Sequence, residues 1–162
     1  MYYLKYFFVM SIVGFIIESF VYSNLGGSGI LYGPWTIIYG LGSIVILLID
    51  KFVRKKTENK FLRVILLFLF STFILTILEF IGGFLIEKVF GIVFWDYSSF
   101  KFHIGKYICI EMALLWGIAS ISFIYLIKPI IEYVIKFIPK ILVYILILLM
   151  VIDFICVFIF KA

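Results

Sequence analysis

Five long apolar segments separate the polar parts of this chain, and they constrain its fold more than any other feature. A helix needs about 20 apolar residues to cross the hydrocarbon core of a bilayer. The second segment opens with Pro34, and a helix tolerates proline in its first turn. We predict an all-α integral membrane protein, a five-helix bundle forming one transmembrane domain over residues 1–162, with spans at about 2–22, 34–49, 62–90, 107–127 and 141–160.

The composition favours the bilayer as the solvent of this chain. Hydrophobic residues make up 66% of it and charged residues only 14%, which is too little polar surface for a water-soluble domain. The first segment differs from a signal peptide, because it contains Glu18 and lacks a cleavage site of small residues. We therefore expect a multi-pass protein of the cell membrane.

The basic residues predict how the spans are oriented. The segment from Asp50 to Arg63 carries six of them, and the positive-inside rule places it in the cytoplasm. The N-terminus is then inside and the C-terminus outside. Ten basic residues lie inside and four outside, the four being Lys88, Lys101, Lys106 and Lys161. Membrane orientation thus accounts for the net charge of +5, and no nucleic-acid partner is expected.

The segment from Lys128 to Lys140 is too short to cross the bilayer. Prolines at positions 129 and 139 bracket it, and Glu132 and Lys136 have the i,i+4 spacing of a helical ion pair. We interpret it as a short cytoplasmic interfacial helix before the last span. A bent extension of the fourth or fifth span is an equally open alternative.

Carboxylates interrupt the apolar spans at one level of the membrane. A charged carboxylate at the bilayer centre costs about 2.5–3.5 kcal/mol, and such residues usually face a bundle interior or a wet cavity. With the predicted orientation, five of them fall in the outer half: Glu18, Glu79, Glu87, Glu111 and Asp153. No basic residue lies within the core of a span to pair with them. The pattern predicts an acid-lined pocket in the outer half of the bilayer, and the alternative is that each acid is a local packing device.

Helical periodicity adds small and polar residues to the same faces. Glu18 aligns with Ser11 and Gly14, while Thr36 and Gly40 form a small-residue stripe on the second span. Such stripes let helices approach closely, so they fit both a packing contact and a site lining. Asp153 has no such stripe beside it, and we leave it out of the predicted site.

Two loops on the outer side complete the predicted site. The first, Ser23–Trp35, has four glycines and no charge, and it matches neither a P-loop nor a dinucleotide-binding fingerprint. The second, Gly91–Lys106, contains aromatic residues typical of a membrane interface. The predicted ligand-binding residues are Glu18, Tyr32, Trp35, Glu79, Glu87, Trp95, Asp96 and Glu111.

The common catalytic and metal-binding patterns are missing from the sequence. Cys109 and Cys156 form no C-x-x-C motif, and His103 is the single histidine. We therefore predict no catalytic residue, no metal site and no cofactor. An intramembrane enzyme that uses paired carboxylates is the least supported alternative.

Three stretches resemble a bacterial family of membrane proteins. "GGSGILYGPWTIIYGLGS", "LEFIGGFLIEKVFGIVFWDYS" and "HIGKYICIEMALLWGI" are similar to the family called Putative ABC-transporter type IV, the CmpB-like permeases. The most specific pieces are Leu31–Trp35 and Trp95–Ser98. His103 stands where we expect an asparagine, which keeps a polar group there but changes its chemistry. The resemblance implies an integral membrane protein related to transport.

The favoured function is a permease or substrate-binding subunit of a transporter in the lipid bilayer. Because the chain has no Walker motif, a separate cytoplasmic ATPase would be required, and Pro129–Pro139 could dock it. A small-molecule or lipid-binding subunit without transport, or a structural subunit, is the alternative. Five spans in 162 residues form a small bundle, which is compatible with a homo-oligomer.

The predicted orientation can be tested with reporter fusions. Fusions at Lys56 should report the cytoplasm, and fusions at Gly27 and Ser99 should report the outside, because of the distribution of basic residues. The reporters are alkaline phosphatase, which is active outside, and a fluorescent protein that folds inside. A cytoplasmic signal at Ser99 would contradict both the orientation and the common depth of the carboxylates.

Overall fold

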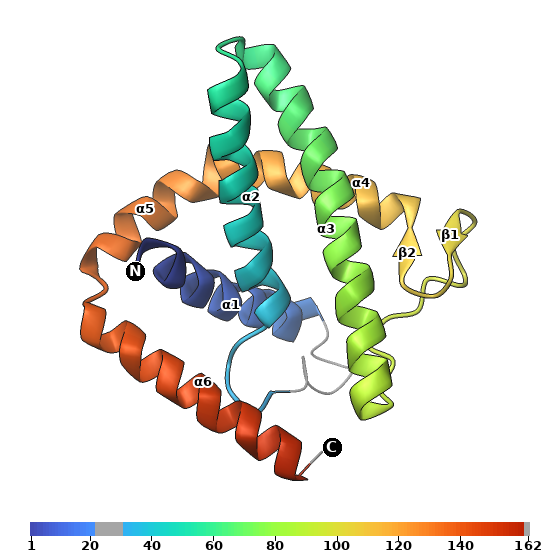
Figure 1. Cartoon of the computed structure of the whole chain (residues 1–162), viewed down its shortest axis with the longest axis vertical. Helices are drawn as coiled ribbons and strands as arrows, with labels where there is room; N and C mark the ends of the chain where they lie inside the picture. Colours follow the sequence, from blue (N-terminus) through green and yellow to red (C-terminus); the bar gives the residue numbers. More distant parts are fainter. Residues whose placement is uncertain (22–30, 161–162) are drawn as a thin grey trace. The chain divides into compact units, whose positions relative to one another are not determined.

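The computed structural model describes residues 1–21 and 31–160. Tyr22 at the end of the first predicted span, most of the glycine-rich loop (residues 23–30) and residues 161–162 lie outside this part. The elements are α1 (Tyr2–Val21), α2 (Ile37–Lys56), α3 (Lys60–Phe90), β1 (His103–Ile104), β2 (Ile108–Cys109), α4 (Ile110–Ser122), the π-helical turn η1 (Phe123–Ile127), α5 (Lys128–Phe137) and α6 (Lys140–Phe160) (Figure 1).

The chain divides into two compact units. The first consists of residues 1–44 and 130–162, and the second of residues 45–129. Helix α2 contributes its beginning to the first unit and its end to the second, while α5 belongs almost wholly to the first. Each unit is described by itself below.

The structure confirms a helical protein with long apolar segments. Within the described residues, four helical segments are long and apolar enough to cross a membrane: Tyr2–Phe20, Lys60–Phe90, Ile110–Phe137 and Lys140–Phe160. Helix α2 has different bounds from the predicted second span, since it begins at Ile37 and continues past Ile49 to Lys56. Its last two turns carry Asp50 and several basic residues, which make this end polar.

Helix α4 continues through η1 into α5 as one helical segment. This arrangement corresponds to the alternative of an extended fourth span. A proline inside a helix loses a hydrogen bond, and its ring clashes with the carbonyl four residues earlier. Here the backbone N–H of Lys128 donates to the carbonyl of Phe123, a π-helical pairing directly before Pro129. The changed pairing lets the helix continue across the proline.

The first unit is held together by apolar packing between sequence-distant segments. Phe8, Trp35, Val143 and Met150 form its buried cluster, and α1 contacts α6 (blue and red in Figure 1). The small-residue stripes that the sequence predicts on α1 and α2 also meet here. Gly40 lies against Ser11, so that a side chain at position 40 would collide with it.

Helix α5 is joined to α1 by polar contacts. The ammonium group of Lys5 donates to the carbonyl of Ile135 at 2.9 Å. The hydroxyl of Tyr2 donates to Glu132 at 2.5 Å, so Glu132 has a partner outside its own helix. Ile131 and Ile135 are buried on the same helix, while Ile130, Tyr133 and Phe137 are exposed. Helix α5 is therefore attached along one side and leaves an apolar side uncovered.

The second unit is built on the packing of α3 against α4. Asn59 caps the start of α3 by accepting from two backbone N–H groups, and Gly91 ends it with the left-handed φ of 67°. Gly117 on α4 lies against Thr72 and Phe68 of α3. A short antiparallel hairpin pairs His103 of β1, in the second predicted loop, with Cys109 of β2, so the predicted fourth span (107–127) begins with a strand and its helix starts only at Ile110.

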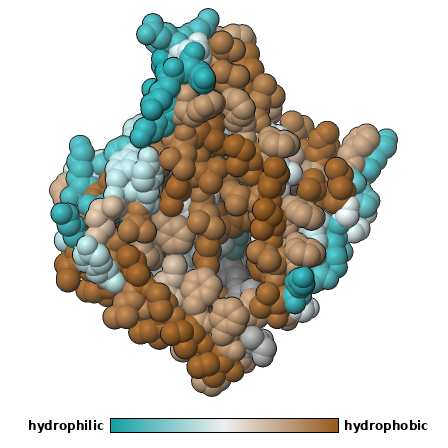
Figure 2. Space-filling model, viewed as in Figure 1, coloured by the Kyte–Doolittle hydropathy of each residue, from teal (hydrophilic) through white to brown (hydrophobic). Residues whose placement is uncertain are grey.

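Polar and apolar residues separate on the surface of the second unit. The turn between α2 and α3 carries exposed charged residues, whereas apolar side chains such as Leu69, Phe73 and Ile77 are exposed along α3. Figure 2 shows teal atoms at this turn and brown atoms over the body of the helices. Exposed apolar side chains along a long helix are expected where lipid is the solvent.

The close approach at Gly117 gives a stability prediction. Gly117→Val inserts methyl groups against Thr72 and Phe68, so we expect a loss of about 1–3 kcal/mol from overpacking. Ala119→Val is the control on the same helix, because Ala119 is exposed, and it should change stability by less than about 0.5 kcal/mol. Circular dichroism during titration with sodium dodecyl sulfate measures both. Equal stability of the two variants would show that α3 and α4 do not pack closely at Gly117.

Candidate functional site

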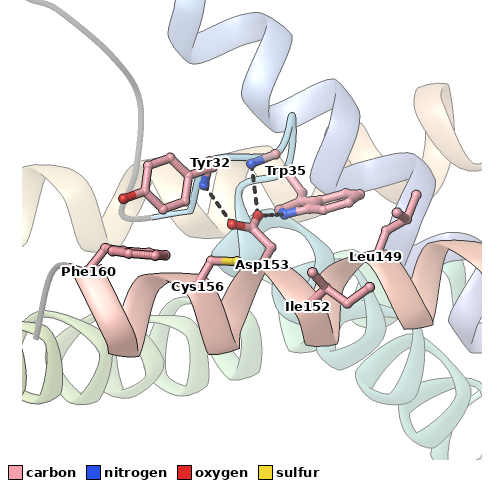
Figure 3. A pocket seen from close by; sticks show the side chains of 8 residues that line it. Tyr32, Trp35, Leu149, Ile152, Asp153, Cys156 and Phe160 are labelled. Carbon is pink, nitrogen blue, oxygen red and sulfur yellow. Dashed lines mark hydrogen bonds between the residues drawn. The ribbon is translucent and has the colours of Figure 1, made fainter.

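A carboxylate near the end of the chain binds the segment that precedes α2. Asp153 on α6 accepts from the backbone N–H of Tyr32 at 2.9 Å and from that of Gly33 at 2.8 Å. The indole N–H of Trp35 donates to the same carboxylate at 2.7 Å. Asp153 is only 8% exposed, and these donors satisfy both of its oxygens (Figure 3). The interaction joins residues about 120 positions apart in the sequence.

The local backbone explains why this segment can present three donors to one carboxylate. Gly33 has no side chain, and the space that a Cβ would occupy is filled by the indole ring of Trp35. The backbone N–H of Trp35 turns back to the carbonyl of Gly33 at 2.9 Å. This tight turn brings the indole N–H to the same side as the backbone donors of Tyr32 and Gly33.

A pocket of about 520 Å³ lies beside this carboxylate. Its volume is within the range of small-molecule sites, about 300–1,000 Å³. Its lining combines a short segment before α2 with one side of α6: Tyr32, Gly33, Trp35, Leu149, Ile152, Asp153, Cys156 and Phe160. Figure 3 shows the rings of Tyr32 and Phe160 near each other, on the same side of Cys156. The pocket is therefore apolar and aromatic, with one acidic group.

The sequence analysis places Tyr32 and Trp35 in the ligand site, and both line this pocket. It leaves out Asp153, because no polar stripe accompanies that residue. The only signal was an isolated acid in a very apolar helix. Its partners are two backbone groups and an indole from a distant segment, which helical periodicity on α6 cannot reveal.

Glu18 has a different environment in the same unit. Its carboxylate accepts from the hydroxyl of Thr36 at 3.3 Å, which is a long hydrogen bond. Glu18 is half-buried on α1 and is not among the residues that line the pocket of Asp153.

Glu79 is the buried carboxylate of the second unit. It is 3% exposed on α3. The hydroxyl of Tyr97 donates to one of its oxygens at 2.8 Å, and the indole of Trp116 donates to the other at 2.9 Å. Glu79 thus joins α3 to α4 and to the loop that follows α3. This resembles the arrangement at Asp153, with a carboxylate that accepts from a loop residue and from an indole.

Glu87 lies two turns further along α3. Its carboxylate pairs with the ammonium group of Lys106 at 2.5 Å and also accepts from the hydroxyl of Tyr107. Gly83 lies between the two carboxylates on the same helix. The rings of Tyr107 and Trp95 pack against it, so a side chain at this position would displace them.

The remaining predicted residues of the second unit, Glu111, Trp95 and Asp96, differ in burial and in hydrogen bonding. One carboxylate oxygen of Glu111 and the indole nitrogen of Trp95 are buried without a hydrogen-bond partner among the described residues. Asp96 is exposed and accepts from the backbone and the hydroxyl of Ser98, and these bonds hold the pKa of its carboxyl below the usual value. Asp96 therefore shapes a turn, as expected for an Asx turn.

The predicted residues consequently group by unit. Tyr32 and Trp35 come together at Asp153 in the first unit, and Glu18 binds Thr36 nearby in the sequence. Glu79 and Glu87 lie on α3 in the second unit, and Trp95 of the following loop packs against Gly83 between them. A pocket shared by carboxylates of both units remains a prediction from the sequence. Within residues 1–21 and 31–160, no three acidic, cysteine or histidine side chains are grouped to hold a metal ion.

Comparison with models of known protein families shows which family the chain belongs to. A family model described as Putative ABC-transporter type IV matches residues 5–161, which is nearly the whole chain. The chain belongs to this family. Both Trp-bearing segments of the site, Leu31–Trp35 and Trp95–Ser98, fall within the match. No curated protein and no solved structure matches the chain significantly.

The role of Asp153 in this family member can be tested by an isosteric substitution. Asp153→Asn keeps the shape of the side chain but replaces one acceptor with a donor. We expect a loss of about 1–3 kcal/mol for each buried donor that is left without an acceptor. Thermal unfolding in detergent, followed by tryptophan fluorescence, measures it.

The control for this substitution is Glu58→Gln, which makes the same chemical change at an exposed position. It should alter stability by less than about 0.5 kcal/mol. A variant Asp153→Asn that unfolds at the same temperature as the unchanged protein would show that the three hydrogen bonds do not hold the segment at Tyr32–Trp35.

Proposed function

We propose that this chain is a membrane permease or substrate-binding subunit of a transporter, and that its pocket at Asp153 takes part in ligand binding. Membership of an ABC-transporter family and four long apolar helices support a transport role. The single observation that carries the site is the pocket in which Asp153 holds Tyr32 and Trp35. A pocket formed by a helix and a distant segment can change shape when either part moves.

The proposal includes the membrane topology expected from the sequence. Five spans with the N-terminus inside and the C-terminus outside would place the protein in the cell membrane, with the turn between α2 and α3 in the cytoplasm. Asp50 supports the cytoplasmic assignment of that end, since it pairs with Arg54 at 2.8 Å and with Lys128 at 3.1 Å. In this topology Asp153 and Glu79 fall in the outer half of the bilayer.

The carboxylates of the second unit form a second group of proposed ligand-binding residues. Glu79, Glu87 and Glu111 would contribute polar groups to the path of the substrate, together with Trp95. One oxygen of Glu111 and the indole N–H of Trp95, which are buried and have no hydrogen-bond partner in the described part of the chain, support this assignment, because such groups are uncommon in structural roles. Glu18 would add a further acid from α1, and Asp96 would hold the turn beside Tyr97.

A separate cytoplasmic ATPase would supply the energy. Helix α5 is the proposed docking element, because Tyr133, Lys136 and Phe137 are exposed on it. Glu132 is unsuited to this contact, since it accepts from Tyr2. A second candidate function, a small-molecule or lipid-binding subunit without transport, is favoured by the same pocket and differs only in needing no ATPase.

Native purification tests the transport proposal. The chain, extracted in mild detergent, should retain a nucleotide-binding subunit, and ATP should drive solute movement in proteoliposomes that contain both. The double substitution Tyr133→Ala with Lys136→Glu should reduce the retained subunit about tenfold, which corresponds to the loss of about 1.4 kcal/mol.

The matched control is Lys101→Glu, which makes the same charge change in the loop between α3 and β1. It should leave the retained ATPase unchanged. If the unmodified chain never retains an ATPase, the transport proposal fails and the subunit without transport takes its place. If the double variant retains the ATPase fully, α5 is not the docking element.

A further inference from the structure

We propose that the pocket beside Asp153 binds an amphiphile that carries an ammonium group. The inference rests on the proposed function in treating this pocket as a ligand site, but it requires neither transport nor an ATPase. It names the ligand by three features of the pocket: the charge of its acid, its aromatic rings and its apolar lining.

The first feature is an acid that has no basic partner among residues 1–21 and 31–160. The three donors to Asp153 are two backbone N–H groups and an indole, all of them neutral. The ion pairs found among the described residues involve Asp50 and Glu87 as acids, and none involves Asp153. The lining residues that the structure describes include no Lys, Arg or His. A cationic ligand would therefore be the only positive charge at this carboxylate within the described part of the chain.

The second feature is the arrangement of aromatic rings. Tyr32 is 59% exposed and Phe160 is 73% exposed, both line the pocket, and their rings lie near each other on one side of Cys156 (Figure 3). Ammonium groups are attracted to the faces of aromatic rings, most strongly where water is displaced. Rings and a carboxylate on the same pocket thus favour an ammonium group and disfavour an anion.

The third feature is the apolar remainder of the lining. Leu149 and Ile152 extend the pocket along α6, which is the most apolar of the four long helices. An apolar chain that lies against these side chains is removed from water, which contributes about 25 cal/mol for each Å² of apolar surface buried. The ligand is therefore an amphiphile rather than a small hydrophilic cation.

Cys156 allows occupancy to be measured in the unmodified protein. It lines the pocket and is partly exposed, whereas Cys109 is only 1% exposed, and the chain has no other cysteine. The rate at which an uncharged maleimide labels Cys156, read by peptide mass spectrometry, reports access to the pocket. The protein is held in nanodiscs of phosphatidylglycerol, which has no ammonium group.

The probes are decylamine, decanol and decanoate, which share one chain length and differ in the head group. We expect decylamine to slow the labelling of Cys156 about fivefold more than decanol does, and decanoate to give no protection beyond decanol. Equal protection by all three would overturn the proposal in favour of an unselective apolar groove. Protection by none would overturn the site itself, and neither result would bear on whether an ATPase is retained.

Two substitutions in the pocket and one control outside it distinguish binding at the pocket from accumulation of amine at the membrane surface. Phe160→Ala leaves the donors of Asp153 in place and should reduce the advantage of decylamine over decanol about threefold. Ile155→Ala, at an exposed position of α6 outside the pocket, should leave it unchanged. Asp153→Asn should abolish it. Accumulation of amine at the anionic nanodisc surface is the same for all these variants. If decylamine still protects Cys156 more than decanol does, to the same extent, in both Phe160→Ala and Asp153→Asn, the proposal is overturned.

Changing the lipid of the nanodisc shows whether the ammonium group belongs to a lipid head group or to a free amphiphile. If it belongs to a lipid head group, nanodiscs of phosphatidylethanolamine should protect Cys156 without any added amine. If it belongs to a free amphiphile, labelling in the two lipids should be equal, and decylamine should protect in both. Failure of both phosphatidylethanolamine and decylamine to protect Cys156 would overturn the ammonium assignment.

Discussion

A polar group on an apolar helix must find its partner inside the protein when lipid is the surrounding solvent, and this structure depends on how two carboxylates do so. Asp153 accepts from Tyr32, Gly33 and Trp35, and Glu79 accepts from Tyr97 and Trp116. Irregular backbone is tolerated at membrane depth only where its polar groups are paired. In each unit a helical carboxylate therefore fixes a loop residue and an indole at a defined position.

In the proposed function, the same interaction prepares the first unit for ligand binding. The hydrogen bonds to Asp153 hold the segment before α2 against α6, and the space left beside them is the pocket. Its aromatic rings come from both segments, whereas its acid and aliphatic side chains come from α6, so the pocket exists only while the segment is docked. An ammonium amphiphile would bridge the two parts. Binding and docking should then stabilise each other, which is the coupling that a substrate-binding subunit needs.

Local features of the sequence predicted the long apolar helices, although α2 has other bounds, and the burial of Glu79. Apolar runs indicate lipid-compatible helices, and the two stripes that contain Ser11 and Gly40 indicate close packing. The role of Asp153 was missed, because its partners lie about 120 residues away and two of them are backbone groups. The continuous helix through Pro129 was one of two open alternatives, since a π-helical turn depends on backbone pairing that side-chain periodicity does not show. The hairpin of β1 and β2 gave no signal, because each strand has only two residues.

Indole N–H resonances test the central claim that these carboxylates hold the loops. The chain has three tryptophans, so ¹⁵N-labelled tryptophan gives one indole signal each for Trp35, Trp95 and Trp116 in nanodiscs. We expect Asp153→Asn to shift the signal of Trp35 and leave that of Trp116 in place, and Glu79→Gln to do the reverse. Unchanged signals in both variants, or the same shifts of all three signals in each, would contradict the account.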